Sequence, residues 1–439
     1  MRDLVFAAVL CGLLPLAAVR PFVGVLLWCW ISFMNPHQTV WGFATTMPWA
    51  MLVFCTTIVG CVMAAEPRRP AVNAVTALLC LFLLCITVTS YTALGPEHVV
   101  WAKWEWAAKI IMGLLLTAAL LTDQRRIHAL VWLMVIALGY YGVRGGLFTI
   151  VTGGSFIVIG PPSSIISDRN HLAAALLITI PLMNYLRTQS RHRAVQLGLI
   201  AAMGLSVFSV VGSQSRGALL GLAAMSLVFW ARSRSKLLSG TAMALGIAVA
   251  VAFMPDSWWA RMHTIETYQE DASAMGRVTI WLASLELAKA HPFTGGGFMA
   301  MYNQAVVNTV APDVQARAAH SIWFEVLGEH GFLTLFVWMG IIAAGAWYSM
   351  RVSALARGRP DLAWAVELAR MSQVSIVAYL VAGSLLSLAY WDFFWTLMVV
   401  QGATFAVVRA ALREGGVTRV GGAIPAGIGW RLRPATARG

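Results

Sequence analysis

Long apolar runs, separated by short polar stretches, fill most of the chain. A helix needs about 20 apolar residues to cross the hydrocarbon core of a bilayer. The runs that approach this length predict an all-α, polytopic integral membrane protein with about 12–13 transmembrane helices. The first two runs are short and can form a tilted or re-entrant pair. The runs lie at 4–18, 22–34, 47–65, 71–92, 104–122, 127–151, 171–187, 194–211, 217–231, 237–254, 321–349, 371–390 and 392–409.

One long segment, residues 255–320, interrupts this pattern. It is far longer than an ordinary connection, and loops of such length are typically functional. Within it, residues 277–290 have helical propensity, and His291-Pro292 is expected to end the helix. The predicted apolar face of this helix consists of Val278, Trp281, Leu282 and Leu285. We therefore expect short helices to lie across the outer mouth of the bundle.

Composition agrees with a membrane protein, and charge assigns its two sides. At 59% hydrophobic and 11% charged residues, the chain is too apolar for a water-soluble globule, whose charged fraction is about a quarter. A formal charge of +13 would suggest nucleic-acid binding in a soluble protein. Here Lys and Arg concentrate in alternate loops and in the C-terminal tail, which the positive-inside rule places in the cytoplasm. Residues 256–320 are slightly acidic and are expected on the exterior face, and no nucleic-acid partner is predicted.

These observations divide the chain into four parts that form one functional domain. N-terminal transmembrane helices at 1–254 precede the exterior loop at 255–320, and C-terminal transmembrane helices follow at 321–410. The tail at 411–439 is rich in Gly, Arg, Pro and Ala and is predicted to be cytoplasmic and disordered.

Polar side chains gather in four clusters that the predicted topology places on the exterior face, each where a helix begins. A helix that enters from this side exposes unpaired N–H groups and the positive end of its dipole, so an adjacent Arg makes an anion site without a metal. The clusters are Ser167-Asp168-Arg169-Asn170-His171, Ser213-Gln214-Ser215-Arg216-Gly217, Gly276-Arg277 and Ala319-His320-Ser321.

The arginines are the candidate anion-binding residues. Ser213 or Ser215 can cap the helix that starts near Gly217, and Arg216 offers a planar fork of donors suited to phosphate. The alternative for Arg216 is a side chain that anchors the helix at the membrane interface. For Arg277 the alternative is a surface salt bridge.

A histidine and several flanking groups complete the candidate site. His320 precedes a span directly, where the helix dipole disfavours imidazolium, so the neutral ring can accept a proton from a hydroxyl; a capping or interfacial role is the alternative. Glu325, one turn later, can orient the ring or face another helix. The candidate substrate-binding residues are Ser215, Arg169, Asn170, His171, Glu325 and Gly296, the last within a Gly run that permits a backbone nest for an anion or sugar.

Missing motifs narrow the function further. The sequence has no Walker loop, no H-E-x-x-H and no D-x-D pair in an exterior loop, which disfavours ATP-driven transport, a zinc protease and a metal-dependent glycosyltransferase. No metal and no cofactor are predicted. Two arginines and a neutral histidine suit transfer from a diphosphate-activated donor, because the arginines stabilise the charge on the leaving group. A transporter of lipid-linked glycans stays an alternative, since Arg144, Lys109 and Asp392 lie within or beside apolar runs.

At these residues the chain resembles the superfamily of bacterial O-antigen ligases and O-antigen polymerases. The resemblance covers roughly residues 165–350, and the N-terminal half resembles the branch of O-glycosylation ligases associated with the exosortase system. The shared motifs are Ser-Arg-Gly-Ala-Leu-Leu-Gly-Leu at 215–222, Gly-Arg-Val-Thr-Ile-Trp at 276–281, His-Pro-Phe-Thr-Gly-Gly-Gly at 291–297, Ala-His-Ser-Ile-Trp-Phe-Glu at 319–325 and Gly-Glu-His-Gly-Phe-Leu at 328–333.

The resemblance implies an enzyme of the bacterial inner membrane with its site on the periplasmic face. It implies metal-independent, inverting transfer of a glycan from an undecaprenyl-diphosphate-linked donor to a lipid, protein or polysaccharide acceptor, in contact with membrane lipids. By position, Arg216 and Arg277 would hold the diphosphate and His320 would deprotonate the acceptor hydroxyl. Ser321 follows His320 where many relatives have Asn. Polysaccharide polymerases share the site, so a polymerase is the alternative within the superfamily.

Overall fold

The computed structural model describes the chain except for residues 65, 67–71, 234, 264–271 and 418–439. The described residues form α-helices, short 3-10 helices and loops, without a β-strand. The all-α prediction is therefore confirmed. The helices of the bundle are α1 (Arg2–Val19), α2 (Pro21–Met34), α3 (Trp49–Met63), α4 (Ala74–Tyr91), α5 (Glu97–Leu120), α6 (Gln124–Val151), α7 (Arg169–Gln189), α8 (Arg193–Gly212), α9 (Arg216–Arg232), α10 (Lys236–Ala252), α14 (Ile322–Leu355), α15 (Ala363–Gly383) and α16 (Asp392–Val417).

Each apolar run that the sequence analysis selected overlaps one of these helices, but the run at 371–390 extends beyond α15, which ends at Gly383 and leaves residues 384–391 outside a helix. Among the described residues, seven helices are long and apolar enough to cross a membrane, and α2, α3 and α10 are shorter apolar helices. The polytopic membrane fold is thereby supported, while the number of spans stays a prediction. α1 and α2 are separate helices because the chain leaves helical geometry at Arg20 and Pro21 opens the next helix.

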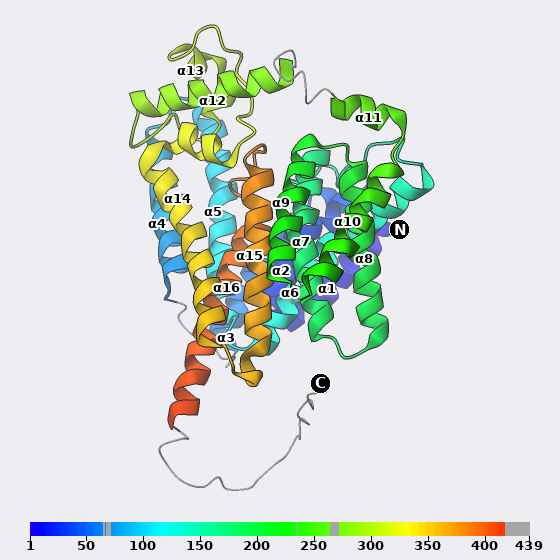
Figure 1. Cartoon of the computed structure of the whole chain (residues 1–439). Coiled ribbons are helices and arrows are strands. Elements are labelled where there is room, and N and C mark those ends of the chain that lie inside the picture. Colours follow the sequence, from blue (N-terminus) through cyan, green and yellow to red (C-terminus); the bar gives the residue numbers. More distant parts are fainter. Residues whose placement is uncertain (65, 67–71, 234, 264–271, 418–439) are drawn as a thin grey trace, which may run out of the picture.

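α7 lies at the centre of one half of the bundle. Every residue from Leu172 to Leu186 is buried, because α6, α8, α9 and α15 pack around this helix. Asp168 and His171 at the start of α7 interact with His320, which precedes α14, and α9 begins at the same end of the bundle (Figure 1). Three of the four polar clusters are brought to one end in this way.

The described part of residues 255–320 forms α11 (Asp256–His263), α12 (Ala272–Ala290) and α13 (Gln304–Asn308). α12 lies across the end of the bundle above α4, α5 and α14, as expected (Figure 1). We call the end of the bundle that α12 covers the insertion end, and we call the other end of the bundle the opposite end. The helix predicted at 277–290 is confirmed, and it ends before His291-Pro292, but it begins earlier, at Ala272.

The predicted apolar face of α12 is wrong. Ile280, Ala283 and Leu287 are buried, against Met301, Val306 and Val307, whereas Val278 and Leu282 are 41% and 57% exposed. Helical spacing generates two apolar stripes on this helix, and only the fold of residues 300–307 decides which of them is covered. Trp281 connects α12 to α14, because its ring stacks on Phe324 with 5.3 Å between the ring centroids.

α14 contains a kink, and α16 is longer than predicted. α14 is kinked at Gly331 (φ 74°), where Phe332 N–H donates to the Pro292 carbonyl (2.9 Å). A side chain at Gly331 would collide with that carbonyl, so the kink requires glycine. α16 continues to Val417, so the tail predicted to be disordered from residue 411 begins as helix; residues 418–439 lie outside the described part.

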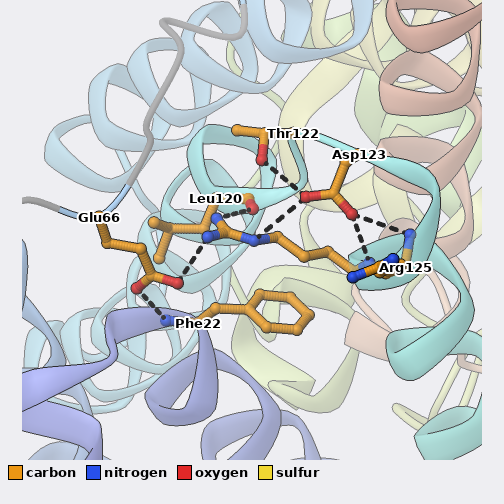
Figure 2. A network of polar contacts seen from close by, with 7 residues as sticks. Phe22, Glu66, Leu120, Thr122, Asp123 and Arg125 are labelled. Carbon is orange, nitrogen blue, oxygen red and sulfur yellow. Dashed lines mark hydrogen bonds and ion pairs between the residues drawn. The ribbon is translucent and has the colours of Figure 1, made fainter. Parts of the chain in front are cut away.

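A polar network joins several segments at the opposite end (Figure 2). The guanidinium of Arg126 contacts Glu66 (2.6 Å), the carbonyl of Leu120 (2.8 Å) and Asp123 (3.5 Å). Glu66 also accepts from Phe22 N–H (3.1 Å), and Asp123 caps α6 by accepting from Arg125 N–H (2.8 Å). The network therefore ties the start of α2 and the segment after α3 to the α5–α6 turn.

Candidate active site at the insertion end

The start of α7 contributes an acid and a histidine. Asp168 is the N-cap and accepts from Asn170 N–H (2.8 Å), and its Oδ1 lies 3.9 Å from His171 Nδ1. Burial opposes ionisation of Asp168, but the bond from Asn170 and the neighbouring His171 outweigh it and lower the pKa of the carboxyl. The other ring nitrogen of His171, Nε2, is buried and has no hydrogen-bond partner among the described residues. Arg169 and Asn170 are half-buried in the same turn.

The start of α9 contributes Arg216. The sequence left the capping residue open between Ser213 and Ser215, and the structure assigns it to Ser215, whose Oγ accepts from Ala218 N–H (3.2 Å). Ser213 ends α8 and donates to the Val210 carbonyl (2.6 Å). Arg216 is the first residue of α9 and is half-buried. It therefore lies where the helix N-terminus is most electropositive.

His320 lies just before α14, in a left-handed conformation (φ 46°). Its N–H donates to Ser387 Oγ (3.1 Å), in the segment 384–391 between α15 and α16. The preceding carbonyl, of Ala319, accepts from Trp281 Nε1 of α12 (2.6 Å). Bonds on both sides thus fix the unusual backbone of this histidine, and strained non-glycine residues of this kind cluster at functional sites.

The electrostatic environment keeps the ring of His320 neutral. Burial lowers the pKa of His320 most, the charge of Arg277 lowers it further and Arg317 adds to this, while Asp168 acts in the opposite sense. The direction agrees with the sequence analysis, but the causes are burial and then the neighbouring arginines, whereas the sequence analysis invoked the helix dipole. The interactions also show that α7, α12 and the approach to α14 converge on this histidine.

Arg277 does not begin a helix, contrary to the sequence-based expectation, because α12 starts at Ala272. It is half-buried within the helix. Its neighbour Gly276 lies against the guanidinium of Arg317, and a Cβ at that position would overlap this group. Gly276 therefore allows a second cation to approach beside Arg277.

Comparison with known proteins assigns the family. Residues 201–339 match a family model described as O-Antigen ligase. This part of the chain, residues 201–339, is an O-antigen ligase domain of that superfamily. Residues 1–192 match a family of unknown function, DUF5935, and the comparison with curated proteins gives no match. The exosortase-associated branch stays a prediction.

The match places three candidate residues of this O-antigen ligase-like membrane enzyme within the family region. Arg216, Arg277 and His320 lie inside residues 201–339, whereas Arg169, Asn170 and His171 lie inside 1–192. His320, Arg277, Asp168 and His171 interact electrostatically. Gly217, the residue after Arg216, lies beside Leu385 of the segment 384–391, and Ser387 of the same segment holds His320.

Glu325 does not orient His320. Its side chain is buried, and Oε2 accepts from Ala389 N–H (3.2 Å). His320 precedes α14 in a left-handed conformation, so the one-turn spacing of a helix does not align the two side chains. Glu325 instead fixes the segment 384–391, which in turn holds His320.

The glycine run does not form an open nest for an anion or sugar. Gly295, Gly296 and Gly297 donate to the carbonyls of His291 (2.8 Å), Gly328 (2.9 Å) and Glu329 (2.7 Å). Gly296 and Gly297 are engaged because the run packs against the first part of α14, and Gly295 is engaged by a local bond to His291. Gly296 is thus a packing position for α14, and we do not retain it as a substrate ligand.

Several residues near the site have no clear sequence signal. Ser387 lies in a short apolar turn, and nothing in its spacing points to His320. Tyr302 lies in the insertion, where burial and then the charges of Glu325 and Glu329 raise its pKa to about 12, partly offset by a hydrogen bond with Ser387. Arg317 is detectable, since it is a cation three residues before His320 in an otherwise acidic segment. Asp168 lies in one of the four polar clusters, but its residue type and spacing do not predict its interaction with His320.

Within the described ranges, no three His, Cys, Asp or Glu side chains gather as a metal centre would require. The metal-free site stays a prediction.

Proposed function

We propose that the chain transfers a glycan from an undecaprenyl-diphosphate-linked donor to an acceptor hydroxyl at the insertion end. The supporting observation is the environment of His320, a histidine held neutral beside Arg277 and Arg317 by burial and charge. A neutral imidazole can accept a proton, and neighbouring cations suit a diphosphate leaving group. This cluster therefore supplies both a proton acceptor for the hydroxyl and cations for the diphosphate.

The proposed step is a single displacement. The acceptor oxygen attacks the anomeric carbon as the bond from that carbon to the diphosphate oxygen breaks, which inverts the configuration. His320 takes the proton from the acceptor hydroxyl, and the electron pair of the broken bond leaves on the diphosphate. Arg216 and Arg277 bind the diphosphate and stabilise the charge that develops on it.

His171 and Arg169 are proposed to bind substrate at the start of α7, with Asn170 beside them. The buried Nε2 of His171 is the feature that supports this, because a buried polar atom without a partner is costly and a ligand hydroxyl or phosphate would satisfy it. Ser215 contributes by capping α9 and so positioning Arg216.

We place the insertion end in the periplasm and the opposite end in the cytoplasm of a bacterial inner membrane. The positive-inside rule supports this orientation, because Arg125, Arg126, Arg187, Arg193 and Arg232 lie at the opposite end. An export-dependent reporter such as alkaline phosphatase should be active when fused after Ala290 and inactive when fused after Ser235. The reverse pattern would contradict the proposed orientation.

The transporter alternative is weaker than transfer chemistry. Lys109 pairs with Glu105 (2.5 Å), and Asp392 accepts from Ser32. Two of the three charged residues that lie within or beside apolar runs therefore have partners inside the protein. A polymerase of the same superfamily differs only in its acceptor, and the acceptor assay below separates the two.

Reconstitution tests the function directly. Purified protein in vesicles receives a radiolabelled undecaprenyl-diphosphate glycan together with a lipid, a protein or a glycan acceptor. We expect the label to move to one acceptor class with release of undecaprenyl diphosphate and without added metal. Movement of intact donor across the bilayer, with no product formed on any acceptor, would contradict transfer and favour the transporter.

A further inference from the structure

A large cavity lies among the N-terminal helices, outside the cluster around His320. Its volume is about 1460 Å³, which exceeds the ~300–1,000 Å³ of most small-molecule sites. Its walls come from the first turns of α1, the segment 36–41 after α2, the last turns of α6 and the segment 156–167 before α7. The segment 156–167 leads into Asp168 at the start of α7, which is at the insertion end.

Hydrogen bonds hold these walls in place. Asp3 at the start of α1 accepts from Gly42 N–H (2.8 Å), and the hydroxyl of Tyr141 in α6 donates to the Met34 carbonyl of α2 (2.5 Å). The fourth wall is bonded to the end of α8, where Val158 N–H donates to the Gly212 carbonyl (3.3 Å). The cavity is therefore built into the fold.

The cavity is cationic. Arg2 and Arg144 line it, and no carboxylate does among the described lining residues. Arg144 is exposed, and it lies seven residues before the end of α6 at Val151, which is roughly 10 Å below the end of the helix. α6 is a candidate span, and a charge at that depth of a membrane needs a partner of opposite sign or water.

Apolar and aromatic side chains surround the two arginines. Val5 and Val9 of α1 and Phe148 of α6 line the cavity and are exposed, so they continue its wall onto the apolar surface of the bundle. Trp41 is at the rim, with the Arg2 guanidinium over its ring at 5.2 Å. A hydrocarbon surface joined to a cationic pocket matches a molecule with an apolar tail and an anionic head.

We propose that this cavity is a lateral binding site for a membrane amphiphile with an anionic headgroup, which Arg144 and Arg2 bind while the tail lies against α1 and α6. The proposal does not depend on the transfer reaction. The cavity is connected to the candidate active site, because the segment 156–167 forms one wall and leads directly to Asp168, which interacts with His171 and His320. A molecule in the cavity would therefore contact the segment that leads to the candidate active site.

Photocrosslinking in nanodiscs tests the proposal. p-Benzoylphenylalanine replaces Phe156, which lines the cavity, or Phe336, which lies on α14 and serves as a matched control because both side chains are 63% exposed. The discs contain phosphatidylcholine with a minor fraction of phosphatidylglycerol of the same acyl chains, and mass spectrometry identifies the lipid in each adduct.

Adducts at position 156 should be enriched in phosphatidylglycerol at least fivefold over its share of the disc, since each arginine near an anionic lipid is worth about 1 kcal/mol. Adducts at position 336 should mirror the disc. Arg144→Gln should lower the enrichment at 156 by about fivefold, whereas Arg232→Gln at the opposite end should not change it. Adducts at 156 that mirror the disc, or enrichment that Arg144→Gln leaves unchanged, would overturn the proposal.

The same measurement in a His320→Ala background separates this proposal from the proposed function. The enrichment at 156 should persist there, because headgroup binding needs no proton transfer. Loss of glycan transfer with retained enrichment therefore concerns the active site alone.

Discussion

Arginines at the two ends of the bundle are used in different ways. At the opposite end, Arg126 reaches Glu66, Asp123 and a backbone carbonyl, so its charge is satisfied within the protein and it clamps several segments together (Figure 2). At the insertion end, Arg277 and Arg317 act on a histidine, and the carboxylate nearby, Asp168, also caps α7. A cation that is paired internally stabilises the fold, whereas cations gathered around a neutral histidine are suited to an external anion.

The largest effect is expected at His320. His320→Ala should lower the transfer rate by about 10²- to 10⁴-fold, the usual contribution of a general base, while the affinity for the diphosphate donor is retained. Transfer is measured in vesicles, and donor binding is measured separately with the lipid-diphosphate glycan. A variant that transfers at the wild-type rate would disprove the assignment of His320 as the base.

A smaller loss is expected at Arg216, and it distinguishes geometry from charge. Arg216→Lys keeps the charge but loses the planar fork, so transfer should fall by about 10- to 10²-fold and donor binding should weaken. Arg232→Lys, in the last turn of the same helix, is the matched control and should leave both unchanged. Equal effects of the two substitutions would mean that Arg216 only anchors the helix.

At the opposite end the expected effect is on stability alone. Arg126→Gln leaves Glu66 without its ion pair in a largely buried place and should cost about 2 kcal/mol, observed as a lower melting temperature. The transfer rate per folded molecule should not change. Lys289→Gln, which breaks an exposed pair with Glu286 on α12, should cost about 0.5 kcal/mol or less. Loss of transfer in folded Arg126→Gln would remove the distinction between the two ends.

The sequence predicted the helices well because each apolar run is a local signal of adequate length. It also placed the polar clusters at one end, since sidedness follows from the positions of Lys and Arg along the chain. It failed where distant backbone segments decide the outcome. The buried face of α12 depends on residues 300–307, Glu325 accepts from Ala389 N–H, and the amides of Gly296 and Gly297 donate to carbonyls of α14.

Part of the candidate site also depends on contacts between segments that are distant in sequence. Ser387 contacts His320 from a segment 67 residues away in sequence, and no periodicity along the chain predicts that contact. The left-handed conformation of His320 is likewise imposed by bonds to α12 and to the segment 384–391. The candidate residues were detectable by type and flanking sequence, whereas the residues that position them were not.

The pH dependence of transfer tests most directly whether the insertion end uses a neutral histidine beside arginines. Because burial and then Arg277 lower the pKa of His320, the base form should persist to a pH below the ordinary histidine range, and the wild-type rate should fall only on further acidification. Arg277→Gln removes a positive charge that opposes protonation, so the pKa of His320 should rise and the acidic limb should move to higher pH. A limb that stays in place or moves to lower pH in Arg277→Gln would contradict the account.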